Sequence, residues 1–184
     1  MGKRALINVD YTVDFVADDG KLTCGKPGQA IEEKIVSITK EFVAAEDYVV
    51  FAIDAHEKGD TLHPETALFP SHNIIGTEGR ELYGTLASVY AKHKDKSNVY
   101  YFDKTRYSAF AGTDLELRLR ERGIDELHLV GVCTDICVLH TAVDAYNKGF
   151  NIVVHKDAVA SFNAAGHEWA LGHFKETLGA KVES

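Results

Sequence analysis

Residues 127–138 read LHLVGVCTDICV, and this stretch decides the fold of the chain. Its first half, Leu127–Val132, is an apolar run typical of a buried β-strand. After a turn of small residues, the apolar spacing of Leu139–Tyr146 is that of an amphipathic helix. Cys137 lies in the first turn of that helix, where the helix dipole and unpaired backbone N–H groups favour a thiolate. Cys137 is therefore a candidate nucleophile.

Apolar strand-like runs alternate with helical ones along the rest of the chain. These continuous runs, rich in β-branched and aromatic residues, suit a parallel sheet covered by helices on both faces. We therefore predict an α/β fold in one domain, residues 1–184. Further strands are expected at Ala5–Val9, Tyr48–Ile53, Val99–Phe102 and Phe150–Val154, with a short one at Ala180–Val182. Helices are expected to end at Gly123, Gly149 and Gly179, because glycine adopts the left-handed conformation cheaply.

Composition narrows the class of protein. The 184 residues are 45% apolar and 26% charged, which is ordinary for a globular protein, and the net charge of −8 argues against binding nucleic acid or anionic membranes. The segment Met1–Arg4 leads straight into an apolar strand, so we expect neither a signal peptide nor a membrane span. Cys24, Cys133 and Cys137 have no disulfide-scaffold spacing, which indicates reduced thiols in a cytoplasmic protein.

Four reactive side chains follow the expected strands, and the carboxyl ends of parallel strands form the site crevice in such sheets. These are Asp10, Asp54, Lys104 and Cys137. Asp10 could take the proton of the Cys137 thiol, and Lys104 could stabilise both that carboxylate and the anion formed at a carbonyl. Backbone N–H groups of Cys133 and Cys137 are placed to form an oxyanion hole. Each residue alone is more often structural, but their joint placement predicts a catalytic site.

A second cluster lies in and after the second strand. Asp54 and His56 are two residues apart and can share one ion, and the irregular segment 57–86 adds Glu65 and His72. Imidazole and carboxylate ligands suit zinc, and also iron or manganese. His63 is a competing ligand that we rank below Glu65. The remaining histidines are interpreted as surface or packing residues: His93, His128, His140, His155, His167 and His173.

Three aromatic residues lie within a few residues of these groups. Phe15, Phe69 and Tyr107 could form a slot for a flat ring, although aromatic side chains are more often part of a core. We expect Trp169, in the last helix, to pack against the sheet instead.

Together these residues resemble the isochorismatase-like cysteine hydrolases, and among them the nicotinamidases, over nearly the whole chain. The most specific match is Gly131–Val138, whereas Asp54-Ala55-His56 is what indicates nicotinamidase. Further matching stretches are Ala5–Asp10 with Asp14-Phe15, Pro70-Ser71-His72, Lys104–Phe110, Gly112–Leu115, Thr141–Ala145 and Asp157–Ser161. The chain departs from the family pattern at Tyr11-Thr12-Val13 and at Ala55, and in the shape of the ligand loop, so Glu65 is the least secure ligand.

The resemblance implies a six-stranded, mostly parallel sheet in a three-layer, Rossmann-like domain. It implies Asp10, Lys104 and Cys137 as the catalytic triad, and a cis peptide between Val132 and Cys133 beside the substrate. Asp54, His56, Glu65 and His72 fall where the family places ligands to one divalent metal, which holds the pyridine nitrogen of nicotinamide. The implied reaction yields nicotinic acid and ammonia through a thioester, in NAD salvage, with pyrazinamide as a further substrate. Homo-oligomers are common in the family.

Four alternatives to a nicotinamidase are considered on the sequence alone. Another amidohydrolase of the family, acting on a ureido or maleamate-type substrate, has no use for the metal cluster. A non-catalytic binding module or a thiol redox protein using Cys133 and Cys137 is a different class, but these cysteines lack the spacing of disulfide oxidoreductases. An isochorismate hydrolase is disfavoured, because its chemistry does not need Cys137.

Overall fold

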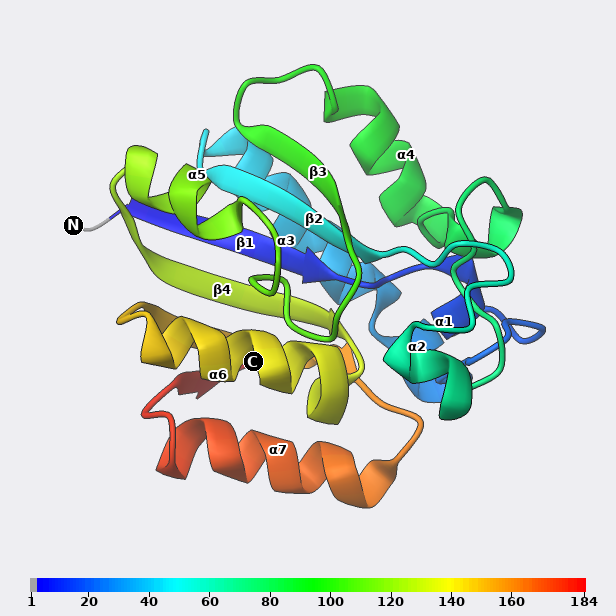
Figure 1. Cartoon of the computed structure of the whole chain (residues 1–184). Coiled ribbons are helices and arrows are strands. Elements are labelled where there is room, and N and C mark those ends of the chain that lie inside the picture. The colour runs from blue at the N-terminus through cyan, green and yellow to red at the C-terminus, as the bar shows by residue number, and fades with distance from the viewer. Residues whose placement is uncertain (1–2) are drawn as a thin grey trace.

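The computed structural model describes residues 3–184, and Met1 and Gly2, the first residues of the segment considered for a signal peptide, lie outside the described residues. Six strands form one sheet in which every pairing is parallel, in the order β3-β2-β1-β4-β5-β6 (Figure 1). The predicted α/β fold with a six-stranded parallel sheet is confirmed. The strands are β1 (Lys3–Val9), β2 (Tyr48–Asp54), β3 (Val99–Lys104), β4 (Ile124–Val132), β5 (Asn151–Ala160) and β6 (Lys181–Glu183).

Helices cover both faces of the sheet, as the unbroken apolar strands require, and β2 is buried along its whole length. One face is covered by α5 (Leu115–Glu121), α6 (Leu139–Asn147) and α7 (Ala164–Glu176). The other face is covered by α1 (Val13–Val16), α2 (Lys26–Ala30), α3 (Glu32–Ala44) and α4 (Gly84–His93). Within residues 3–184, no helix combines the length and the apolar character needed to cross a membrane.

The close approach of β1 and β4 depends on Gly131, near the end of β4. Gly131 has φ +117° in the strand next to β1, and a Cβ there would lie 2.0 Å from the carbonyl oxygen of Val9. No other residue type fits, because any side chain would push β1 and β4 apart. The close approach brings the ends of these two central strands together, and the site residues follow them directly. Gly123, Gly149 and Gly179 also have positive φ at the predicted turns.

Cys137 lies in a short π-helical turn, η3 (Thr134–Val138), that joins β4 to α6. The turn is anchored from β5, because the hydroxyl of Ser161 donates a hydrogen bond to Asp135 at 2.6 Å. The peptide bond between Val132 and Cys133, immediately before the turn, is cis.

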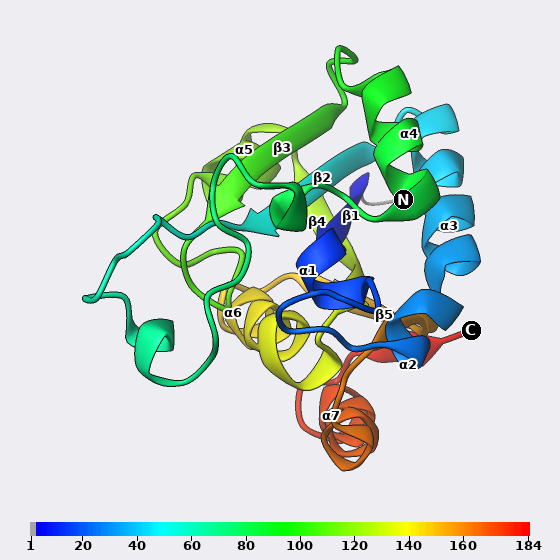
Figure 2. The ribbon, with the colours of Figure 1, turned by 90° about the vertical axis from the view of Figure 1, so that its right-hand side faces the viewer.

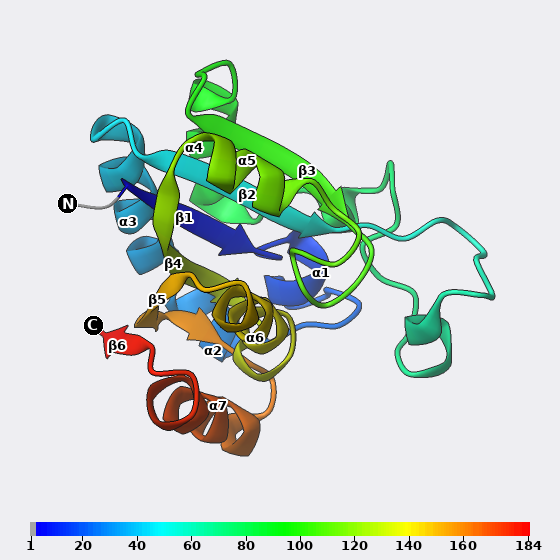
Figure 3. The same ribbon diagram turned by 60° about the vertical axis from the view of Figure 1, so that its left-hand side comes forward.

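The irregular segment between β2 and α4 projects beyond the carboxyl ends of the strands (Figures 2 and 3). It contains two short 3₁₀ helices, η1 (Pro64–Ala67) and η2 (Glu78–Arg80). A β-bridge between His56 and Ile74 closes the loop formed by the residues between them. The segment therefore returns over the sheet edge at the place where the predicted site residues end their strands.

The prediction for Trp169 is wrong. Its side chain is 58% exposed and stacks on His173, with 4.8 Å between ring centroids. The buried positions of α7 are Ala170 and Phe174, so the sheet-facing stripe begins one residue later. One residue along a helix is a rotation of about 100°, which turns Trp169 away from the sheet.

Candidate active site

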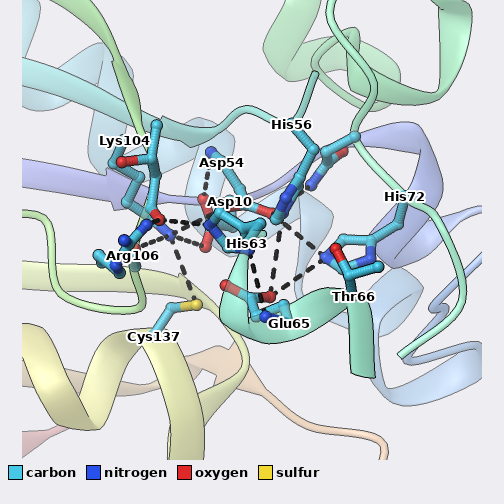
Figure 4. A network of polar contacts seen from close by, with 12 residues as sticks. Asp10, Asp54, His56, His63, Glu65, Thr66, His72, Lys104, Arg106 and Cys137 are labelled. Atoms are coloured by element: carbon cyan, nitrogen blue, oxygen red, sulfur yellow. Dashed lines mark hydrogen bonds and ion pairs between the residues drawn. The ribbon is translucent and has the colours of Figure 1, made fainter. Parts of the chain in front are cut away.

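Asp10, Lys104 and Cys137 meet at the carboxyl edge of the sheet (Figure 4). Asp10 follows β1, Lys104 ends β3 and Cys137 lies in the turn after β4. The Lys104 ammonium lies 2.8 Å from an Asp10 carboxylate oxygen and 3.5 Å from the Cys137 sulfur. Asp10 and Lys104 are completely buried, and Cys137 is 6% exposed. The three predicted catalytic groups therefore form one connected, water-excluded cluster.

Burial controls the protonation of the nucleophile. It raises the pKa of the Cys137 thiol well above its ordinary value, and the nearby Lys104 opposes this rise without overcoming it. Desolvation disfavours the sulfur anion and so acts against the effect expected from the helix start. Cys137 rests as a thiol and needs a base.

Asp10 has the properties of that base. Burial raises its pKa to about 6, while Lys104 and a hydrogen bond with Cys137 limit the rise. Burial disfavours the Lys104 ammonium, but Asp10 and the other anionic groups nearby more than compensate and raise its pKa. The Asp10 backbone has φ 53°, a left-handed conformation rare outside glycine, and the N–H of Asp54 donates to its carboxylate at 2.8 Å. The carboxylate is thus held in one position between the amine and the sulfur.

The four predicted metal ligands also converge, with one ligand atom of each within 4.8 Å of the others. His56 Nε2 lies 2.8 Å from an Asp54 oxygen and 3.9 Å from a Glu65 oxygen, and His72 Nε2 lies 3.3 and 3.5 Å from the same two oxygens. Ligands around a tetrahedral zinc ion are about 3.3 Å apart, given zinc–ligand bonds of about 2.0 Å. All four residues are buried.

A buried ring nitrogen without a hydrogen-bond partner also supports a metal ion at these four residues. His72 Nε2 has no hydrogen-bond partner of acceptable geometry, whereas Nδ1 of the same ring lies 2.8 Å from the carbonyl oxygen of Pro70. Such a carbonyl fixes the ring so that Nε2 presents its lone pair, which is how metal-bound histidines are oriented. Two imidazoles and two carboxylates that face one another in this way fit a divalent metal ion.

His63 does not belong to this ligand group. Its Nδ1 accepts a hydrogen bond from the backbone N–H of Glu65, and its Nε2 lies 2.7 Å from the carbonyl oxygen of Thr105. Both ring nitrogens are therefore engaged elsewhere. His63 instead caps the short helix η1, which carries Glu65 toward His56 and His72.

Asp14 and Asn73 support the ligand loop, and Asn73 is absent from the sequence-predicted site. Asp14 accepts a 2.7 Å hydrogen bond from the Asn73 backbone N–H, next to the ligand His72. The Asn73 side chain accepts a bond from the Thr12 hydroxyl at 2.9 Å, and its backbone has φ 45°. A sequence signal does exist, because asparagine is one of the few residues that adopt this conformation readily.

The aromatic residues surround the cluster, and the Phe15 ring lies 5.3 Å from the His72 ring. Phe69 lies 6.2 Å from the same ring, and Tyr107 lies 5.2 Å from His140 in the helix after Cys137. A cavity of ≈ 120 Å³ is lined by His56, His63, Glu65, Phe69 and His72 among others, but not by the three catalytic candidates. It opens on the metal-ligand side of the site. The side chain of Val132 is completely buried and belongs to the hydrophobic core that includes α3.

The free thiol of Cys133 contacts the free thiol of Cys24 rather than that of Cys137. The two sulfur atoms are 3.4 Å apart and both residues are buried. This arrangement gives no support to a redox pair formed by Cys133 and Cys137, one of the alternatives left open by the sequence.

The isochorismatase domain family matches residues 4–184 of the chain. A protein of Bacillus subtilis described as the uncharacterized isochorismatase family protein PncA is 71% identical over 180 residues, which is 98% of each chain.

Two solved structures are also similar. The nicotinamidase/pyrazinamidase PncA of Bacillus subtilis is 66% identical, with a TM-score of 0.98 over 99% of this chain and 100% of that one. The pyrazinamidase of Pyrococcus horikoshii, solved in complex with zinc, is 28% identical, with a TM-score of 0.84 over 98% of each chain.

Proposed function

The chain belongs to the isochorismatase domain family, and we propose that within it this protein is an amide hydrolase that converts nicotinamide to nicotinic acid and ammonia. The observation that carries the proposal is the position of Asp54, which joins the two halves of the site. One Asp54 oxygen lies 3.8 Å from the Lys104 ammonium and the other lies 2.8 Å from His56 Nε2. A small substrate can therefore touch a metal ion and the nucleophile at once, as a ring nitrogen and a ring carboxamide require.

Asp54, His56, Glu65 and His72 would hold one divalent metal ion, with zinc as our assignment. When bound, the ion supplies a Lewis acid that anchors the pyridine nitrogen of the substrate. Solved relatives support this assignment through the pyrazinamidase in complex with zinc. Phe15, Phe69 and Tyr107 would enclose the flat ring, and pyrazinamide, with a similar ring, would be a second substrate.

The first chemical step is attack by sulfur. Asp10 takes the proton of the Cys137 thiol, and the sulfur forms a bond to the carboxamide carbon. The electron pair of the C=O bond moves to oxygen, where the backbone N–H groups of Cys133 and Cys137, together with the Lys104 ammonium, stabilise the anion. Lys104 is well suited to this role, because its raised pKa keeps it charged throughout.

The second step releases ammonia. The C=O bond re-forms and the C–N bond breaks while Asp10 passes its proton to the departing nitrogen, which leaves a thioester on Cys137. Water then loses a proton to Asp10 and adds to the thioester carbon. The C–S bond breaks, the sulfur regains a proton and nicotinic acid leaves. A carboxyl with a pKa of about 6 can act in both directions near neutral pH. Recycling of nicotinamide in this way would serve NAD salvage.

An ammonia-release assay tests the proposal. The purified protein is given nicotinamide, pyrazinamide, benzamide and a linear ureido acid, before and after metal stripping. We expect turnover of the first two, and we expect that benzamide, which lacks the ring nitrogen, is hydrolysed with a much lower kcat/KM. Stripping the metal should remove this preference by raising KM for nicotinamide. Faster release from the ureido acid than from nicotinamide would assign the protein to another amidohydrolase activity.

A further inference from the structure

A second group of histidines and carboxylates lies on the sheet, and it shares no residue with the active site. Glu126 and His128 are on β4, His155 is on β5 and Glu183 is on β6, the edge strand (Figure 3). The His128 ring packs on Phe42 of α3, with 4.9 Å between centroids. The two imidazoles are only 6% and 7% exposed, so they must satisfy their ring nitrogens within the protein.

The two rings are linked to each other and to Glu126 by hydrogen bonds. His128 Nε2 lies 3.0 Å from a Glu126 oxygen, so this nitrogen carries a hydrogen and donates it. His128 Nδ1 then presents a lone pair to His155 Nε2, 2.9 Å away. His155 therefore carries its hydrogen on Nε2 and donates it to His128. Its other nitrogen, Nδ1, lies 3.7 Å from a Glu183 oxygen, beyond hydrogen-bond distance.

A divalent cation bound between the two rings would take the place of this hydrogen. One nitrogen of each ring and one Glu183 oxygen lie within 4.8 Å of one another. Two imidazoles and a carboxylate are a common zinc ligand set. The contact from Glu126 to His128 has the form of the carboxylate–histidine–metal arrangement that orients such ligands.

We propose that His128, His155 and Glu183 bind one divalent transition-metal ion, such as Zn²⁺, at a site distinct from the active site. The adjustment needed between the two imidazoles is small. Tetrahedral ligands lie about 3.3 Å apart, so the facing nitrogens, now 2.9 Å apart, would separate by about 0.4 Å. The ion would link three neighbouring strands and fasten β6, which is only three residues long, to the sheet.

Two lysines place positive charge near the proposed metal site, but they leave its ligand atoms free. Lys181 pairs with the second oxygen of Glu183, which leaves the first oxygen facing His155. Lys34 of α3 contributes further positive charge near His155. The carboxylates of Glu126 and Glu183 offset these two charges, so the cluster can accept a dication.

Cobalt binding in a variant that lacks the active-site imidazoles tests the proposal. In the full chain carrying His56→Ala and His72→Ala, Co²⁺ titration should reveal one bound ion with the visible absorption of a four-coordinate site. Adding Glu126→Gln, which removes only the group orienting His128, should weaken Co²⁺ binding about 10- to 100-fold. Adding Glu183→Gln, on the short edge strand, should weaken it at least as much.

The matched control is His93→Gln, which removes a histidine from the end of α4 and should leave Co²⁺ binding unchanged. A shared proton between the rings, in place of a metal, would appear as no Co²⁺ uptake by the background variant and would overturn the proposal. Uptake unaffected by Glu126→Gln and Glu183→Gln would overturn it as well. The measured quantity is metal binding, so a failure of the nicotinamidase assignment would leave this result unaffected.

Discussion

The buried ion pair between Lys104 and Asp10 makes a quantitative prediction about stability. Lys104→Met removes the ammonium from a site where both partners are completely inaccessible to solvent and 2.8 Å apart. Breaking one side of such a pair leaves an uncompensated buried charge, so we expect the free energy of unfolding to fall by about 3–5 kcal/mol. The matched control is Lys148→Met, which breaks a 2.7 Å pair with Glu116 whose partners are about one-third exposed. The control should cost no more than about 1 kcal/mol.

Urea unfolding, followed by circular dichroism in the presence of a chelator, measures both losses. Removing Lys104 removes the principal influence that lowers the pKa of Asp10, so this pKa rises further above about 6. The folded state then binds the Asp10 proton more tightly than the unfolded state does, and stability falls as pH rises through the raised pKa. The loss caused by Lys104→Met should therefore be largest near pH 8 and should shrink toward pH 5.

A second substitution separates the orphaned charge from a loss of packing. Asp10→Asn in the Lys104→Met background removes the uncompensated carboxylate, so it should recover most of the lost stability. If Lys104→Met costs no more than Lys148→Met, or if the added Asp10→Asn recovers nothing, the reasoning about this pair is refuted.

Three further predictions concern activity and metal binding. The kcat/KM for nicotinamide should rise with pH to a plateau, with a midpoint no higher than about 6, because Asp10 is the base. A midpoint near the ordinary thiol pKa of about 8.5 would contradict this assignment. Cys133→Ser should retain kcat within about 10-fold, because the Cys133 sulfur faces Cys24. Cys137→Ala should show no turnover. Equal losses of ammonia release in the two variants would contradict the assignment of Cys137 as the nucleophile. His72→Ala should lower the zinc content measured by mass spectrometry, and His63→Ala should not. A loss of zinc in His63→Ala but not in His72→Ala would make His63 the ligand instead of His72.

Much of the fold could be predicted because the signals are local. The apolar run that ends at Val132 and the switch to helical spacing after Cys137 define a strand and a helix without knowledge of the rest of the chain. Asp10 and Lys104 follow from the topology alone, since parallel strands end at the same edge of the sheet.

Properties that depend on packing between distant segments could not be predicted. The pKa of the Cys137 thiol is raised by burial among distant segments, which acts against the local effect of the helix start. The orientation of Trp169 was predicted wrongly because a single apolar residue does not define which face of a helix is buried. The contact between His128 and His155 depends on the register of β4 and β5, which no sequence period encodes, so each histidine alone appeared to be an ordinary packing residue.

The most direct test of the catalytic account is to identify the acylated residue during turnover. The enzyme is mixed with nicotinamide, quenched in acid within milliseconds, digested and analysed by mass spectrometry. The account predicts a nicotinoyl group on Cys137 that appears before nicotinic acid and disappears as substrate is exhausted. A nicotinoyl group on any other residue, or undiminished ammonia release by Cys137→Ala, would contradict it.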